Sequence, residues 1–157
     1  MQLEDYCMNY TFRIIEKNEI LIIKELWKKL NEIHLKNSHY FKEHYETFTF
    51  EKRCEKFDMI NSENIRIEII EDDKTTIGYC ISTIQKSTGE IDSIYVKEEY
   101  RGTGLGSSLI DHSLNWFHTK KCDKIIIAVA EGNESAYPFY KKFDFYPRLT
   151  YLQQKKG

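Results

Sequence analysis

The sequence has few cysteines, no clustered metal ligands and no membrane-length apolar run, and each absence excludes a class of protein. Its four cysteines lie far apart and form no CxxC pair, which indicates separate thiols rather than disulfides. The five histidines show no HExxH-type spacing, so we expect no metal site. No apolar run is long enough to span a bilayer, and the first residues lack a signal-peptide pattern. We therefore expect a cytoplasmic protein with no membrane partner.

The chain also lacks an excess of either charge. Its 23 lysines and arginines against 25 aspartates and glutamates give a net charge of −2. A general nucleic-acid binder needs a basic surface for phosphate contacts, so we expect no nucleic-acid partner. With 157 residues, 41% of them hydrophobic, the chain has the size and composition of one folded domain, which we place at 1–157.

Apolar periodicity predicts an α/β fold with a mixed sheet, in the order β-α-α-β-β-β-α-β-α-β. The expected strands are 11–16, 64–72, 75–84, 90–96, 123–130 and 145–155, and the expected helices are 18–37, 49–60, 105–121 and 133–143. Short polar turns make the three middle strands antiparallel neighbours. The segment 123–130 is almost entirely apolar, which is typical of a strand buried on both faces beside a parallel neighbour.

Three of only seven glycines, Gly102, Gly104 and Gly106, lie between a predicted strand and the helix that follows it. The first amide groups of a helix have no intrahelical acceptor, and the helix dipole is positive there. Glycines let an anion approach the backbone closely, and Arg101 adds a fixed positive charge. This pattern predicts a phosphate site. Neither GxxxxGK[ST] nor GxGxxG fits, because Ser107 stands where each motif needs a glycine.

The pattern that fits is RxxGxG, formed by Arg101, Gly104 and Gly106. A second motif follows in "VAEGNESAYPFYKKFDF", with Asn133, Tyr140 and Phe145. On these two motifs the sequence resembles the GCN5-related N-acetyltransferase (GNAT) family, and nearly the whole chain follows that family's element order. Asp144 replaces the usual glycine of the second motif. Aspartate tolerates a positive φ better than most residues, so we expect the chemistry to survive the replacement.

The resemblance implies transfer of the acetyl group of acetyl-CoA to a primary amine, by direct attack in a ternary complex. The acceptor would be a small, polyamine-like amine or an amino group of a peptide or protein. The family's central strands splay where the pantetheine arm enters. Tyr140 would be the acid that protonates the departing thiolate. The implied cofactor-binding residues are Ile94, Tyr95, Val96, Arg101, Gly102, Thr103, Gly104, Leu105, Gly106 and Asn133.

The amine must lose a proton, and Glu90 and Asp92 are the candidate bases. Strict alternation along the strand places them on the same side as Ile94 and Val96, and carboxylates attract ammonium groups. Glu131 is a further candidate base. The N-terminal helices and the aromatic stretch 39–50 would wall the acceptor pocket.

Two other functions stay open from the sequence. In the first alternative, the domain is a non-catalytic sensor or scaffold that binds acyl-CoA without turnover. The presence of Tyr140 favours an enzyme over this alternative. A nucleotide-dependent oxidoreductase is the third alternative. Members of the family often form homodimers, but no interface is legible in this sequence.

Overall fold

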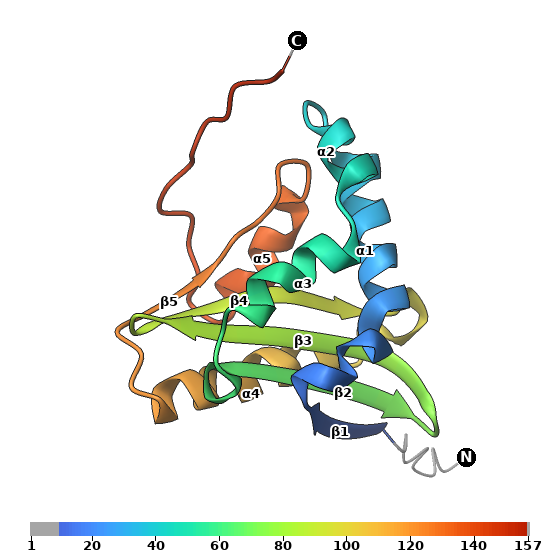
Figure 1. Ribbon diagram of the computed structural model, residues 1–157, viewed down its shortest axis with the longest axis vertical. Coiled ribbons are helices and arrows are strands. Elements are labelled where there is room, and N and C mark those ends of the chain that lie inside the picture. The colour runs from blue at the N-terminus through green and yellow to red at the C-terminus, as the bar shows by residue number, and fades with distance from the viewer. Residues whose placement is uncertain (1–9, 157) are drawn as a thin grey trace, which may run out of the picture.

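A five-stranded mixed sheet forms the centre of the computed structural model, which describes residues 10–156 (Figure 1). The strand order is β1-β2-β3-β4-β5, antiparallel from β1 to β4, with β5 parallel to β4. The strands are β1 (Tyr10–Ile15), β2 (Ile65–Asp72), β3 (Thr75–Gln85), β4 (Thr88–Val96) and β5 (Lys124–Ile127). The predicted mixed α/β fold is therefore confirmed.

Helices cover both faces of the sheet. On one face lie α1 (Lys24–Asn37) and α3 (Phe50–Asp58), and α4 (Leu105–Thr119) lies behind the sheet in Figure 1, where α2 (Lys42–Thr47) lies beside the far end of α1, away from the sheet. The short helix α5 (Tyr137–Lys141) packs into the apolar cluster on the α4 side. None of the helices in the described part of the chain is both long and apolar enough to cross a membrane.

Side-chain alternation along the strands divides the core into two clusters. Ile67 and Ile69 of β2 contact the cluster beneath α1 and α3, whereas Ile70 belongs to the cluster beneath α4. Gly89 allows α4 to approach β4, because a Cβ atom there would lie 2.5 Å from the ring of Phe117. The crossover helix α4 thus packs directly against the strand that precedes it.

The structure corrects two of the predicted elements and adds a helix that was not predicted. The last strand, 145–155, is wrong, because no strand is assigned anywhere from Asp144 to Lys156. Strand β5 ends at Ile127 rather than at residue 130, and α2 lies in a segment for which the sequence predicts no regular structure. Strand propensity alone does not make a strand, since each strand needs a neighbour for its backbone hydrogen bonds.

Candidate active site

The glycine loop, residues 101–106, is largely exposed to solvent and connects the end of β4 to the start of α4. Gly102 and Gly104 have φ angles of 79° and 86°, a left-handed conformation that glycine adopts without strain. A Cβ atom built at either position meets no heavy atom within 4 Å, so the space in front of both residues is empty of protein. The loop therefore offers room for a ligand beside the backbone.

The start of α4 supplies hydrogen-bond donors to this space. Gly104 caps the helix, and its carbonyl accepts the amide of Ser108 at 3.0 Å. The amides of Leu105, Gly106 and Ser107 precede that bond and have no acceptor four residues earlier within the helix. The amide of Arg101 already donates to the carbonyl of Glu98 at 3.1 Å. The unpaired donors and the empty space together fit a phosphate group.

The side chain of Arg101 turns back toward β4. Its Nε donates to the carbonyl of Val96 at 2.8 Å, and its guanidinium lies 5.2 Å from the ring centre of Tyr95. The residue nevertheless remains exposed at the mouth of the loop. Arg101 therefore joins the glycine loop to the end of β4.

The second half of β4 has one open edge. Pairing with β5 covers only Thr88 to Ile91, which lie opposite Lys124 to Ile127. Beyond Ile91, β4 continues to Val96 and remains paired with β3 on its other side. Within the described residues, the two central strands therefore stop pairing immediately before the segment that leads to the glycine loop.

A β-bulge lies where this pairing stops. Ser93 lies opposite Ile81 and Ile91 lies opposite Ser82, so Asp92 is an extra residue on β4 without a partner in the ladder. Bulges re-aim side chains and are common beside active sites. Here the bulge bends the strand at the point where its outer edge becomes open.

The bulge also overturns the alternation that we predicted. Glu90 and Asp92 contact side chains of α3, and Tyr95 belongs to the core cluster on that same face. Ile94 and Val96 instead contact the cluster beneath α4. The prediction that the two acids share a side with Ile94 and Val96 is therefore wrong, because one extra residue reverses the alternation beyond it.

The two acids are held in a compact polar cluster. Lys56 Nζ lies 2.9 Å from Glu90 and also donates to the carboxylate of Asp92, which accepts a second bond from the Thr83 hydroxyl. Arg53 donates to the main-chain carbonyl of Asp92 at 2.7 Å. The Asp92 side chain is fully buried, whereas that of Glu90 is 23% exposed. Helix α3 is thereby attached to the bulge of β4.

Burial and hydrogen bonding act in opposite directions on this cluster. Burial raises the pKa of Asp92, although hydrogen bonds from Lys56 and Thr83 oppose the increase. Burial lowers the pKa of Lys56, but its bonds to Asp92 and Glu90 outweigh that effect and leave the pKa above its usual value. A charged lysine therefore stands between the two acids. Sequence reasoning missed Lys56 and Arg53, because their positions on α3 carry no motif.

Tyr140 lies within the apolar cluster beneath α4, partly buried on α5. Its ring packs edge-on to those of Phe139 and Phe145, with ring centres 5.3 and 6.4 Å apart. Burial, with a smaller contribution from Cys80, raises the pKa of Tyr140 to about 12. The hydroxyl therefore stays protonated near neutral pH, as a proton donor must. Asp144 has a φ of 64°, the conformation expected at the position of the usual glycine.

The loop after β5 is tied to the end of α1. The Glu131 carboxylate accepts the hydroxyl of Ser38 and the amides of His39 and Tyr40, the last at 3.1 Å. The Ser38 hydroxyl is the main reason that the pKa of Glu131 falls to about 2. A Cβ atom on Gly132, whose φ is 90°, would lie 2.2 Å from the carbonyl oxygen of Asn37. Glu131 thus holds the loop in place, a role that fits poorly with a proton-accepting base.

Asn133 follows directly and caps the turn that leads into α5. Its carbonyl accepts the amide of Ala136 at 3.0 Å, and its own amide donates to Ala130 at 3.0 Å. The side chain of Asn133 is partly exposed. Its position is therefore set by the same loop that Glu131 and Gly132 attach to α1.

A cleft of about 400 Å³ opens between α1 and the end of β4. One face of α1 lines it at helical spacing, and the opposite wall comes from β4 and the residues just after it. The lining residues are Lys29, Glu32, Ile33, Lys36, Tyr95, Glu98, Glu99 and Arg101. This volume lies within the range of about 300–1,000 Å³ that is common for ligand pockets. A smaller hollow of about 210 Å³ lies beside the β3–β4 turn, at the other end of β4.

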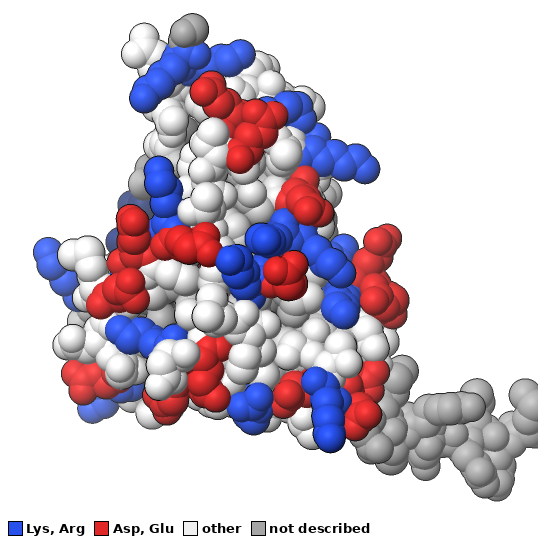
Figure 2. Space-filling model, turned by 45° about the vertical axis from the view of Figure 1, so that its right-hand side comes forward, with Lys and Arg blue, Asp and Glu red and all other residues white. Residues whose placement is uncertain are grey.

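Charges of both signs are interspersed over the face of the molecule in Figure 2, and no region of it is dominated by one sign. The cleft repeats this mixture, with three basic and three acidic side chains in its lining. Such a surface suits a ligand with its own separated charges better than a long polyanion.

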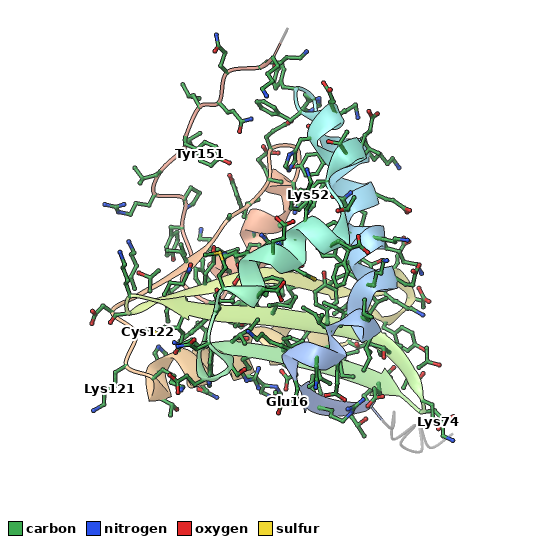
Figure 3. The ribbon with its side chains drawn as sticks, in the orientation of Figure 1. Glu16, Lys52, Lys74, Lys121, Cys122 and Tyr151 are labelled. Atoms are coloured by element: carbon green, nitrogen blue, oxygen red, sulfur yellow. The ribbon has the colours of Figure 1, made fainter. Side chains whose placement is uncertain are left out.

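The described cysteines are poor candidates for a nucleophile. Cys80 is fully buried, and burial raises the pKa of its thiol to about 11. Burial also raises the pKa values of Cys54 and Cys122. Figure 3 shows Cys122 just before β5, at the end of the sheet away from the β2–β3 turn that carries Lys74. Cys7 lies outside the described residues.

Comparison with known proteins identifies the family. The model of the acetyltransferase (GNAT) family matches residues 27–145, well over half of the chain. The chain therefore belongs to the GNAT family of acetyltransferases, as the two sequence motifs indicated.

Two curated relatives resemble part of the chain. A Bacillus subtilis (strain 168) protein, provisionally named an alanine N-acetyltransferase of ribosomal protein bS18, is 33% identical over 79 residues, covering 50% of this chain and 52% of that protein. The thialysine N-epsilon-acetyltransferase of Bos taurus is 34% identical over 70 residues, covering 41% of each chain. This chain thus matches about half or less of the length of each relative.

Among solved structures, the PaiA N-acetyltransferase of Thermoplasma acidophilum in complex with coenzyme A has the same fold. The TM-score is 0.67, with 18% sequence identity, and the match covers 87% of this chain and 89% of that one. At this level of identity the likeness concerns the fold alone.

Proposed function

We propose that this protein transfers the acetyl group of acetyl-CoA to a primary amine. The observation that carries this proposal is the open edge of β4 from Asp92 to Val96, which leads directly into an open helix start. A ligand with a peptide-like arm and a diphosphate needs both features, one to pair with the arm and one to hold the anion. Acetyl-CoA has this shape and supplies an activated acetyl thioester.

Different residues of the chain bind the diphosphate and the peptide-like arm of acetyl-CoA. The amides of residues 102–107 and the dipole of α4 hold the diphosphate, with Arg101 at the mouth of the loop. The open edge at Ile94, Tyr95 and Val96 pairs with the arm, and the Asn133 side chain bonds it from the opposite loop. The arginine contact to the Val96 carbonyl keeps that edge in position.

Attack by the amine raises three chemical requirements, and the chain offers a candidate group for each. An alkyl amine is protonated near neutral pH and must lose a proton before it attacks. Glu90 is the more accessible acid of the pair and accepts that proton through water, while buried Asp92 holds Lys56 and the bulge. A main-chain amide near Tyr95 or Val96 stabilises the oxyanion, and Tyr140 protonates the thiolate.

The acceptor is a primary amine that enters through the cleft beside α1. Glu32, Glu98 and Glu99 line this cleft and attract a cationic amine, and Lys29 and Lys36 suit a carboxylate elsewhere in the same substrate. The two curated relatives are named for alanine of a protein and for thialysine, which both carry a primary amine. We therefore place amino-acid-like amines and peptide N-termini first among the substrates.

The test is a measurement of free coenzyme A with the full-length protein. Acetyl-CoA is incubated with an alanine-initiated peptide, thialysine, lysine and a polyamine in parallel, and thiol release is compared with the reaction lacking an amine. Release that depends on one of these amines supports the transferase. Tight binding of acetyl-CoA with no release on any amine would instead establish the non-catalytic binding module.

A further inference from the structure

Lys56 of α3 places its ammonium group between the two acidic side chains of β4. Its Nζ lies 2.9 Å from the carboxylate of Glu90 and also donates to that of Asp92. Arg53, one turn earlier on the same helix, lies 3.6 Å from the carboxylate of Asp92. Two cationic side chains thus face two acidic ones, so the cluster has no net formal charge. The two acids that the sequence predicts to attract a substrate amine are therefore already paired within the chain.

The position of this ammonium group is fixed by the way α3 is anchored. Phe50 and Phe57 of α3 are only 2% and 1% exposed and belong to the core cluster above the sheet. At the end of the helix, Lys17 Nζ donates to the carbonyls of Phe57 at 3.2 Å and Ile60 at 2.5 Å. The backbone of Lys56 therefore has little freedom to move away from β4.

The cluster can be reached from solvent. The side chains of Lys56 and Glu90 are 32% and 23% exposed. Ile126 of β5 lies opposite Glu90 in the parallel pair, and it is 41% exposed. Directly opposite residues present their side chains on the same face of a sheet, so the face above β5 beside Glu90 is open. A ligand on this face can therefore contact the cluster.

The cluster also lies where the proposed reaction would take place. In the proposed function, the arm of acetyl-CoA follows the open edge of β4 from the glycine loop as far as Ile91, where pairing with β5 begins. The bulge at Asp92 is next to that point. Charged groups of an amine that attacks the acetyl group would therefore come within reach of Glu90 and Lys56.

We propose, on the basis of the proposed acetyl transfer, that Lys56 is a specificity-determining residue whose ammonium group occupies the place where the second ammonium group of a diamine would bind. The protein then discriminates against diamines and favours amines whose remaining groups carry no net positive charge. Both amino groups of an alkyl diamine are largely protonated near neutral pH, and the one that does not react stays charged. That charge would meet Lys56 at the same carboxylates, and a like charge at a binding site opposes binding.

A purely structural role of Lys56 makes a different prediction. If Lys56 only attached α3 to the bulge, its removal would impair turnover of all amines to the same extent. If it determines specificity, its removal should change the ratio between a diamine and a monoamine of the same chain length. Burial lowers the pKa of Lys56, but bonds to Asp92 and Glu90 outweigh that effect, so the competing group is a charged ammonium.

The test compares cadaverine with pentylamine in the full-length protein, by release of coenzyme A. In the wild type, kcat/KM should be at least tenfold higher for pentylamine than for cadaverine. Lys56→Ala should raise the ratio of cadaverine to pentylamine at least tenfold, and added salt should reduce this gain. Lys56→Arg, which keeps the positive charge, is the matched control and should keep the ratio of the wild type. A wild type that uses both amines equally well overturns the proposal, as does an unchanged ratio in folded Lys56→Ala.

A second variant separates specificity from folding. Removing one partner of a buried charge pair is strongly destabilising, and Asp92 is buried. Lys56→Ala combined with Asp92→Asn removes that buried charge as well, leaves Glu90 accessible, and should raise the same ratio. Far-UV circular dichroism shows whether each variant is folded.

Calorimetric titration with cadaverine detects the vacated place without any turnover. Cadaverine should bind at least tenfold more tightly to Lys56→Ala than to the wild type or Lys56→Arg. If this is found although no amine releases coenzyme A, the role of Lys56 in amine binding stands and the proposed acetyl transfer fails. If amines are acetylated but titrations and ratios are the same in all folded variants, acetyl transfer stands and the role of Lys56 is overturned.

Discussion

The loops after β4 and β5 both contain glycines with positive φ, yet the two loops are built in opposite ways. A Cβ atom placed on Gly102 or Gly104 would have no neighbour within 4 Å, whereas one placed on Gly132 would meet the carbonyl of Asn37. The first loop ends in the first amides of α4, which have no acceptor within the helix, whereas in the second loop the Glu131 carboxylate accepts bonds from three donors at Ser38, His39 and Tyr40. Gly102 and Gly104, which leave space for a ligand, therefore have φ angles similar to that of Gly132, which allows close packing; the two kinds of glycine differ only in what surrounds them.

The largest effect is expected for Gly132→Ala. The new Cβ atom would lie 2.2 Å from a backbone oxygen that has little freedom to move, and the positive φ adds strain. We expect a loss of about 3 kcal/mol in the free energy of unfolding. Gly102→Ala, with φ of 79° and no neighbour within 4 Å, is the matched control and should lose only about 1 kcal/mol. Equal losses in urea unfolding would remove the distinction between the two loops.

The second-largest effect is expected on turnover, from removing the hydroxyl of Tyr140 on α5, the helix that follows the second loop. Tyr140→Phe keeps the ring packing but removes the hydroxyl, so turnover should fall about 10²-fold with unchanged affinity for acetyl-CoA. Because the pKa of Tyr140 is raised to about 12, its deprotonation should cause no loss of activity at moderately alkaline pH. Phe139→Leu, beside it, serves as a packing control. Undiminished turnover in Tyr140→Phe would show that solvent protonates the thiolate.

Gly104→Val tests the open loop and should act mainly on cofactor binding. Its branched side chain would fill the empty space beside the donors of α4, so the dissociation constant for acetyl-CoA should rise about tenfold, or about 1.4 kcal/mol. The φ of 86° adds about 1 kcal/mol of destabilisation. Calorimetric titration measures the first quantity and thermal unfolding the second. Wild-type affinity in a folded variant would contradict the phosphate assignment.

The smallest effect is expected for Glu131→Gln, which weakens the attachment of the second loop to α1. The folded-state pKa of Glu131 is about 2, below the usual value of 4.5, so its carboxylate stabilises the fold above about pH 4.5. That stabilisation is lost as the pH falls from 4.5 toward 2. Glu131→Gln should therefore lower the free energy of unfolding near neutral pH by about 1 kcal/mol. It should also reduce the loss of stability that the wild type shows as the pH falls from 4.5 toward 2. Glu55→Gln, at an exposed position on α3, is the control and should change neither the stability near neutral pH nor its loss in acid, both measured by urea unfolding across this pH range.

Sequence reasoning predicted the ligand-binding role of the first loop but not the packing role of Glu131 in the second. Arg101, Gly104 and Gly106 form a local motif, and a local motif can be read without knowing what lies nearby in space. The hydrogen bonds to the Glu131 carboxylate join residues more than ninety positions apart, and no local sequence motif marks them. Lys56 and Arg53 were missed for the same reason, since each meets β4 only through the packing of α3.

The sequence by itself determined the family, the order of most elements, and the glycine-rich start of α4, because these depend on short-range patterns of apolar, polar and glycine residues. Only the tertiary structure decided which face each residue of β4 presents, because one bulged residue reverses every later position. It also decided that residues 145–155 form no strand within this chain. A strand depends on a neighbour for its hydrogen bonds, and the sequence does not say whether that neighbour belongs to the same molecule.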